Sequence, residues 1–589
     1  MQIFCCSSAN ERSPGCHVML FWPSSSSAGQ PRVAGGAPLA PPLGPRIVSC
    51  CKLLHRAALN CHITPGDSSH GSSVCCPACP AVLEAMCALP WRTQLGLLCV
   101  VLLCGTPLCC GRPDPRRREA LKQLEMMREI GGSVVLNDKE KLLDEKLHQL
   151  KLQDMALPEF PPSMHFFKAK PLIERSPVFS FLQKMPKGAA LHVHDFAMVG
   201  VEWLVKNITY RENCYVCFTA DNSVRFLFSA GQPEPQTHCS TWTLLKTLRQ
   251  KMNSTELDSS FIRNLTLFTE DPDKAYPDQD VVWTRFEQAF LVAYGLVTYA
   301  PIFKDYLYEG LRQFYMDNIM YVEIRALLPP TYELDGRRNS KDWSMRACQE
   351  VLQRFRAQYP DFIGARVIFT VHRGLNLTEA VKAVEEAMTL QRNFPDIMAG
   401  FDFVGREDSG RPLWYFREAL ELPEEWGIHL PYFFHAGETD SEGTDVDQNM
   451  MDALLFNTSR IGHGFAMTRH PVVKELARKM DVAVEVCPIS NQVLKLVSDL
   501  RNHPAAVLMA EGHPMVISSD DPALFEASGL SYDFYQAFMG FGGMRSNLAT
   551  LKELAVNSLR YSSLSSAVKD KATAALLVKW DKFVSETLL

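Results

Sequence analysis

The sequence predicts an α/β protein whose main part is a closed (β/α)8 barrel. Eight short apolar runs end in polar or ionisable residues, and most of the gaps between them have helical periodicity, as at 377–394 and 447–457. The runs cover residues 189–195, 320–325, 365–372, 398–405, 430–438, 460–464, 482–490 and 514–521. Because such barrels gather their chemistry at the carboxyl ends of the strands, the polar residues that end these runs form the candidate site.

The composition is that of a globular protein. The chain has 589 residues, of which 47% are apolar and 21% charged. This length suffices for a large barrel with additions, or for two to three smaller domains. The formal net charge of −6 leaves no basic footprint, so nucleic acid is not indicated as a partner.

The first 110 residues differ from the rest of the chain, because they hold 14 of the 19 cysteines and are rich in Ser, Pro and Gly. Residues 1–85 are therefore expected to be disordered or an alternative start. Residues 86–111 have the anatomy of a secretory signal peptide: Arg92 precedes the ten-residue apolar run 95–104. This run is too short to span a bilayer comfortably. We expect Met86 to be the initiator and the protein to be secreted; a weak membrane anchor or a stray apolar patch is the alternative.

Acceptor sites for N-glycosylation support secretion independently. The triplet Asn-x-Ser/Thr recurs beyond the signal segment. The acceptors are Asn207, Asn253, Asn264, Asn376 and Asn457. Together with the small number of cysteines beyond residue 110, they predict an extracellular glycoprotein.

An N-terminal arm, residues 112–184, precedes the barrel. Residues 119–128 and 138–150 place apolar side chains at spacings of three and four, and Gly131 and Gly132 separate the two stretches. The arm therefore predicts helices that pack or self-associate, and we expect a homodimer.

A second addition, residues 207–266, follows the first strand near the mouth of the barrel. It holds three of the five later cysteines and three of the acceptor sites, with little helical pattern. It is predicted to be an inserted extracellular module that binds a cell-surface receptor or a glycosaminoglycan. Cys239 can bridge to Cys214 or to Cys217, which leaves one of those two unpaired.

Four residues at strand ends have the chemistry of a zinc site. His192 and His194 alternate along the first strand, so both imidazoles project to the same side. His435 ends the fifth strand and Asp520 ends the eighth. Three nitrogens and one carboxylate oxygen are a plausible ligand set for Zn²⁺ that leaves a position for water.

Three further residues surround this predicted metal. Glu438 lies three residues after His435, past a glycine, and is the expected proton shuttle beside a metal-bound water. His463 ends the sixth strand between two glycines, and its alternative role is that of a hydrogen-bonded structural histidine. Asp521 follows Asp520 directly and is expected to face a heteroatom of the substrate.

Five motifs resemble those of the adenosine/AMP deaminase family, over about residues 185 to 585. They are Met185-Pro-Lys-Gly-Ala-Ala-Leu-His-Val-His-Asp195, His435-Ala-Gly-Glu438, Arg460-Ile-Gly-His-Gly464, Cys487-Pro-Ile-Ser-Asn491 and Ser518-Ser-Asp-Asp-Pro522. The arm, the insertion and the predicted secretion resemble the extracellular subgroup of that family, the adenosine-deaminase-related growth factors.

The resemblance implies a role for each matching residue. One Zn²⁺ per subunit would be held by His192, His194, His435 and Asp520. Glu438 would protonate N1 of adenosine, His463 would orient the attacking hydroxide, Asp521 would contact N7 and the Gly405 N–H would reach N3. The ribose would meet Asp195, Trp283, Glu287 and His372, although Val371 stands where the subgroup has Asp. Our working disulfide assignment is Cys217–Cys239, with Cys214 as the alternative partner.

Two alternative functions and one alternative zinc-site design differ in what they require. Deamination of AMP needs Lys or Arg at the pocket rim, where we locate no cluster, and an acidic lining from Asp195 and Glu287 would repel a phosphate. A secreted receptor-binding protein could use the barrel only as a scaffold, but the set of site residues is intact. The other zinc deaminase design pairs H-x-E with P-C-x-x-C, and neither Cys76–Cys79 nor Cys214–Cys217 belongs to that motif.

Overall fold

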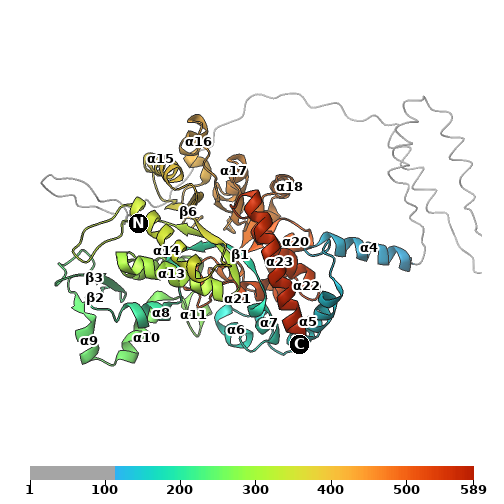
Figure 1. The fold of residues 1–589 in the computed structure, drawn as a ribbon, viewed down its shortest axis with the longest axis horizontal. Helices are drawn as coiled ribbons and strands as arrows, with labels where there is room; N and C mark the ends of the chain where they lie inside the picture. The colour runs from blue at the N-terminus through green and yellow to red at the C-terminus, as the bar shows by residue number, and fades with distance from the viewer. Residues whose placement is uncertain (1–112) are drawn as a thin grey trace, which may run out of the picture. The chain divides into compact units, whose positions relative to one another are not determined.

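The computed structural model describes residues 113–589 (Figure 1). These residues belong to one compact unit. The predictions for 1–85, for the signal peptide 86–111 and for Met86 as initiator lie outside the described residues. Within the described part, every helix is too short or too polar to cross a bilayer.

Eight parallel strands form the centre of the molecule, in two four-stranded sheets with the orders β1-β5-β6-β7 and β8-β9-β10-β11. Each strand falls within or beside one of the eight predicted runs. They are β1 (Gly188–His194), β5 (Ile319–Ala326), β6 (Gly364–His372), β7 (Met398–Val404), β8 (His435–Ala436), β9 (Arg460–His463), β10 (Ala483–Val486) and β11 (Met515–Ile517).

Backbone bridges at two seams join these sheets into a barrel. At the β7 seam, the Phe401 N–H donates to the Pro431 carbonyl (2.9 Å), and the Phe433 N–H donates to the Phe401 carbonyl (3.1 Å). At the β1 seam, the His194 N–H donates to the Asp520 carbonyl and the Asp520 N–H donates to the His192 carbonyl, each at 3.1 Å. The predicted (β/α)8 barrel is therefore confirmed. The strands β8 and β11 are shorter than their predicted runs because single bridges replace a continuous ladder there.

Helices follow the strands around the barrel, as the periodicity predicts. Asn376 and Glu379 form a capping box that begins the predicted 377–394 helix, whose small residues Ala380, Ala383 and Ala387 are buried on one face. Outside the 207–266 insertion, the α-helices between and after the strands are α8 (Val201–Trp203), α11 (Pro272–Ala275), α12 (Gln279–Val297), α13 (Ala300–Met316), α14 (Lys341–Gln358), α15 (Leu377–Asn393), α16 (Arg417–Glu425), α17 (Asn449–Leu455), α18 (Pro471–Lys479), α19 (Pro488–Val493), α20 (Ala505–Ala510), α21 (Ser531–Tyr535), α22 (Leu548–Arg560) and α23 (Ser566–Leu588).

The N-terminal arm consists of helices, as predicted: α4 (Pro115–Arg128), α5 (Asp138–Met155), α6 (Phe166–Ile173) and α7 (Pro177–Lys184). Glu140 ties α5 to the C-terminal helices, because its carboxylate accepts the Trp580 indole N–H (2.9 Å) and pairs with Lys552 (2.5 Å). In contrast, α4 buries no side chain, and Leu124 and Met127 are 63% and 66% exposed. Figure 1 shows α4 projecting away from the barrel.

The insertion folds as a small antiparallel sheet of order β3-β2-β4, with β2 at Cys214–Phe218, β3 at Val224–Phe228 and β4 at Thr243–Leu244. A disulfide joins Cys217 to Cys239, and Cys214 is buried and free. The expectation of little helix was wrong, because α9 (Leu245–Lys251) and α10 (Ser254–Leu265) follow the sheet. Asn253 caps α10, and Leu257, Phe261 and Leu265 make its buried stripe.

Close packing of α12 against β3 holds this module on the barrel, and Gly295 is the contact point. A Cβ at position 295 would lie 1.8 Å from the Phe226 carbonyl oxygen.

We expect Gly295→Ala to destabilise the protein by about 2 kcal/mol despite the better helix propensity of alanine. Thermal unfolding measures this effect. Gly231→Ala is the control, since nothing lies within 4 Å of a Cβ there, and equal melting of the two variants would contradict the packing argument.

Candidate metal centre and active site

Histidines from three strands meet an aspartate at the carboxyl end of the barrel. Potential ligand atoms of His192, His435, His463 and Asp520 all lie within 4.8 Å of one another, and all four residues are buried. His194, which is half-buried, forms a second such group with Asp520 and Asp521. The structure therefore brings the four predicted ligands together and places His463 beside them.

Unusual backbone conformations mark this end of the barrel. His463 and Asp520 both have positive φ, at 61° and 59°, a left-handed conformation that costs a residue with a Cβ about 1 kcal/mol or more. Gly462 permits a close approach of β9 to β1, because a Cβ there would lie 3.2 Å from Cε1 of His192. Strain and close packing are thus concentrated where the polar groups converge.

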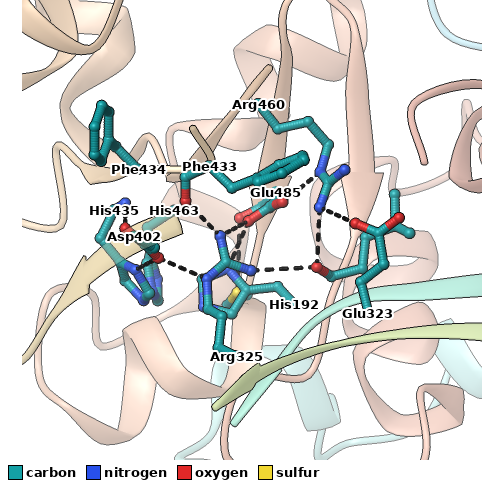
Figure 2. Close-up of polar contacts among 12 residues, drawn as sticks. His192, Glu323, Arg325, Asp402, Phe433, Phe434, His435, Arg460, His463 and Glu485 are labelled. Atoms are coloured by element: carbon teal, nitrogen blue, oxygen red, sulfur yellow. Dashed lines mark hydrogen bonds and ion pairs between the residues drawn. The ribbon is translucent and has the colours of Figure 1, made fainter. Parts of the chain in front are cut away.

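Two buried carboxylates orient the predicted histidine ligands (Figure 2). His192 Nδ1 lies 2.7 Å from Glu485 Oε2, and His435 Nδ1 lies 2.6 Å from Asp402 Oδ2. A carboxylate accepts the ring proton at Nδ1, so the lone pair of each neutral ring stays on Nε2. Both rings are therefore held in the tautomer that binds a metal through Nε2.

One guanidinium joins these two carboxylates. Arg325 Nε donates to Asp402 Oδ2 (2.8 Å), and Arg325 Nη2 donates to Glu485 Oε2 (2.7 Å). Arg460 donates to the other oxygen of Glu485 (2.5 Å) and to Glu323 (2.7 Å), and Figure 2 shows the whole network. All of these side chains are buried. Burial opposes ionisation of Glu485, but the two guanidinium groups hold its pKa well below the usual range.

Sequence reasoning missed this network, although a signal for it exists. The strands 320–325, 398–405 and 482–490 are apolar, yet they carry charged residues inside their runs: Glu323 and Arg325, Asp402, and Glu485. Side chains two apart on a strand share a face, so Glu323 and Arg325 had to point into the barrel together. A buried charge needs a partner, which would have directed the search to the other strands.

The donor set fits a zinc ion. Asp520 Oδ1 lies 3.2 Å from His192 Nε2 and 3.1 Å from His194 Nε2. Within 113–589, both His192 Nε2 and Asp520 Oδ1 are buried without a hydrogen bond of good geometry. Converging imidazole lone pairs and a carboxylate oxygen, otherwise unsatisfied, are what a Zn²⁺ ligand shell supplies.

Glu438 is held in place by a carboxylate that sequence reasoning also missed. The N–H groups of Gly437 and Glu438 donate to the two oxygens of Glu407, at 3.0 and 2.6 Å, and the Asn449 amide donates to it at 2.6 Å. Glu438 Oε1 lies 3.5 Å from His463 Nδ1. Burial, with the nearby carboxylates of Asp520 and Glu407, raises the pKa of Glu438 well above its usual range. A carboxyl with a raised pKa suits a general acid.

The predicted contacts of the purine lie around this cluster. Asp521 is buried with its Oδ1 unpartnered among the described residues, and burial together with Asp520 raises its pKa well above the usual range. Gly405 has φ 97°, and a Cβ there would lie 2.4 Å from His372 Nε2, so these two residues are in contact. Their roles toward a substrate stay predictions.

The remaining predicted ribose contacts have different surroundings. Asp195 is largely shielded and accepts the Leu327 N–H (3.1 Å), and burial raises its pKa to about 8. Trp283 is buried on α12 against Phe286, with ring centroids 5.1 Å apart. Glu287, one turn further along α12, is exposed.

The predicted glycosylation acceptors are mostly accessible. Asn207, Asn253, Asn376 and Asn457 are exposed. Asn264 is half-buried, and its amide donates to the Ser260 carbonyl (3.0 Å). Accessibility permits modification and does not test it.

Asp402 offers a test of the metal site that does not depend on activity. Its Oδ1 accepts the His435 backbone N–H (3.0 Å), and its Oδ2 accepts both His435 Nδ1–H and Arg325. In Asp402→Asn, either orientation of the amide turns an NH₂ toward a donor. We expect zinc affinity to fall about 10- to 100-fold, measured by competition with a chromogenic chelator. Asp361→Asn at the surface is the control. An unchanged affinity in folded Asp402→Asn would refute the orienting role.

Comparison with known proteins gives consistent matches. The family described as Adenosine deaminase matches residues 268–579, and the Adenosine/AMP deaminase N-terminal family matches 115–182. The chain is 75% identical over 491 residues to adenosine deaminase 2-A of Danio rerio, covering 83% of this chain and 97% of that protein. It is 51% identical over 478 residues to adenosine deaminase 2 of Homo sapiens (80% and 93% covered). It is 40% identical over 470 residues to an adenosine deaminase of Phlebotomus duboscqi (78% and 90% covered).

Proposed function

This chain belongs to the adenosine deaminase family, and we propose that it is a zinc-dependent hydrolase that converts adenosine and 2′-deoxyadenosine to the inosine nucleosides and ammonia. The observation that carries the proposal is the convergence of His192 Nε2, His194 Nε2 and Asp520 Oδ1 beside a buried, protonatable Glu438. Zinc and general-acid chemistry at one point is what hydrolysis of an aromatic C–N bond requires.

The metal would be one Zn²⁺ per subunit, held by His192, His194, His435 and Asp520. When bound, it supplies a water that is activated at neutral pH. Glu485 and Asp402 keep the rings of His192 and His435 oriented toward it through their Nδ1–H groups. Arg325 pairs with both of those carboxylates, and Arg460 pairs with Glu485 and Glu323, so each buried carboxylate of the network has a guanidinium partner.

Glu438 would donate its proton to N1 of the purine, which makes C6 electrophilic. Water then adds at C6, the C6–N bond breaks, and the amino group leaves as ammonia. His463 would orient the attacking oxygen, Asp521 would hydrogen-bond to N7, and the Gly405 N–H would reach N3. The backbone hydrogen bonds to Glu407 support this arrangement, because they fix where Glu438 can point.

The ribose would be bound by Asp195, Trp283, Glu287 and His372. Contact between His372 and Gly405 supports the placement of His372 beside the purine. The exposed carboxylate of Glu287 at the proposed ribose site disfavours a phosphate, which is why we propose a nucleoside rather than AMP or another 6-aminopurine nucleotide. AMP therefore serves as the comparison substrate in the test.

We also propose that the protein is secreted, is glycosylated at the five acceptor asparagines, and forms a homodimer through the arm 112–184. The exposed apolar residues of α4 support self-association.

The disulfide-linked sheet of the 207–266 module has a surface of its own, which supports binding of a cell-surface receptor or glycosaminoglycan and a growth-factor-like role. A scaffold without catalysis is the competing proposal.

The acid role of Glu438 is tested with Glu438→Gln. We expect this variant to retain about one zinc per subunit and to lose deamination by about 1,000-fold, because the amide cannot give up a proton. Metal analysis and inosine formation from adenosine are measured together, with AMP in parallel. Exposed Glu442→Gln is the matched control. Full activity in Glu438→Gln would refute the role.

The wild-type protein decides between the proposed functions in the same assay. Metal binding with turnover of AMP alone would overturn the nucleoside assignment. Metal binding without turnover of either substrate would support the metal site and overturn the proposed substrate class. Absence of both metal and turnover would favour the scaffold.

The dimer is tested by deleting residues up to 127 and, separately, by Leu124→Asp with Met127→Asp. Because α4 buries no side chain, neither change should unfold the protein. We expect the mass measured by sedimentation to fall from that of a dimer to that of a monomer. An unchanged mass would contradict the role of the arm.

A further inference from the structure

A line of three buried side chains leads from the active site through Asn491 on α19 to His503. His463 Nδ1 lies 3.1 Å from Asn491 Nδ2, and Asn491 Oδ1 lies 3.0 Å from His503 Nε2. The line ends on backbone, because the Ala505 N–H donates to His503 Nδ1 at 3.0 Å. All three side chains are buried. Neither Asn491 nor His503 has a role in the function proposed above.

The backbone end sets the direction of every hydrogen bond in this line. A backbone N–H can only donate, so His503 Nδ1 must carry a lone pair, and the ring proton lies on Nε2. His503 Nε2–H therefore donates to Asn491, and the group of Asn491 that faces it must be the carbonyl oxygen. This orientation turns the amide nitrogen of Asn491 toward His463.

The same rule then fixes the ring of His463. The amide nitrogen of Asn491 has only hydrogen to offer, so His463 Nδ1 accepts, and the ring proton of His463 lies on Nε2. Glu438 Oε1 also faces Nδ1 but is farther away, at 3.5 Å against 3.1 Å for the Asn491 amide. That nitrogen faces the metal centre, 3.8 Å from Asp520 Oδ2. We propose that Asn491 and His503 are positioning residues that hold His463 in the Nε2–H tautomer.

This tautomer is the opposite of the one held in the neighbouring histidines. His192 and His435 give Nδ1–H to carboxylates, so their Nε2 atoms offer lone pairs. His463 lies in the same 4.8 Å group but presents an N–H there. It therefore cannot ligate the metal and instead donates a hydrogen bond into the site. The role of that donor, orienting the attacking oxygen, rests on the proposed function.

Packing keeps the line in register. The His503 ring lies against Phe465 and Phe541, with centroids 5.1 and 4.7 Å away. Asn491 lies on α19, which directly follows the strand β10 that carries Glu485. A cationic His503 would place a second ring N–H against the Ala505 N–H, so this hydrogen bond requires the neutral ring with its proton on Nε2.

The test is Asn491→Asp, which replaces the donor facing His463 with an acceptor of the same shape. The ring proton of His463 then moves to Nδ1, and its Nε2 gains a lone pair directed at the metal. We expect kcat on adenosine to fall about 100-fold, the cost of losing one preorganised donor, with KM changed less than threefold and one metal retained. After replacement of zinc by Co²⁺, the visible absorption should shift as a further nitrogen enters the coordination sphere.

Three controls separate positioning from a structural role. Exposed Asn502→Asp makes the same chemical change nearby and should leave kcat and the Co²⁺ spectrum unchanged. Asn491→Ser keeps an O–H donor and should retain kcat within about fivefold. His503→Leu removes the group that orients the amide and should lower kcat about 10-fold.

Two outcomes would overturn the inference. One is wild-type kcat with an unchanged Co²⁺ spectrum in Asn491→Asp. The other is an equal loss of kcat, metal and thermal stability in Asn491→Asp and Asn491→Ser. The Co²⁺ spectrum tests the tautomer even if the wild-type protein does not deaminate adenosine, so failure of the proposed function is distinguishable from failure of this inference.

Discussion

The site depends on the pairing of the buried Arg325 guanidinium with two carboxylates. The guanidinium contacts Asp402 and Glu485, and each of these carboxylates holds one histidine ring by its Nδ1–H. An unpaired charge in the barrel interior would cost several kcal/mol, so the pairing must be complete. Arg460 supplies the second guanidinium, which pairs with Glu485 and with Glu323. The carboxylates that pair with Arg325 are therefore the same groups that orient the histidines.

The direction of the hydrogen bond at Nδ1 gives the histidines of the site different roles. A carboxylate beside Nδ1 leaves the Nε2 lone pair of His192 and His435 free for a metal, whereas the Asn491 amide beside His463 leaves an N–H. Glu407 acts similarly on the backbone, because it gathers two N–H groups and thereby places the neighbouring Glu438. Residues that never touch a substrate thus decide what the residues facing it can do.

The additions to the barrel are attached by specific contacts. Glu140 joins the arm to the C-terminal helices, and the close contact at Gly295 seats the inserted sheet on α12. Both additions leave surface unused by the barrel: α4 buries nothing, and the sheet has its own small core around the disulfide. The surfaces available for partner binding on α4 and on the inserted sheet therefore lie outside the barrel that carries the candidate active site.

The sequence by itself determined the eight strands, the arm helices and the identity of the ligand-type residues, because these depend on local periodicity and on residue chemistry at strand ends. Tertiary structure alone decided contacts between residues far apart in the chain, such as His192 with Glu485 and His463 with Asn491. It also decided the disulfide. Alternation along β2 places Cys217 with Tyr215 in the small core that contains Cys239, while Cys214 faces the main core. The spacing of residues along the sequence leaves these pairings open, because they depend on which strand faces meet in space.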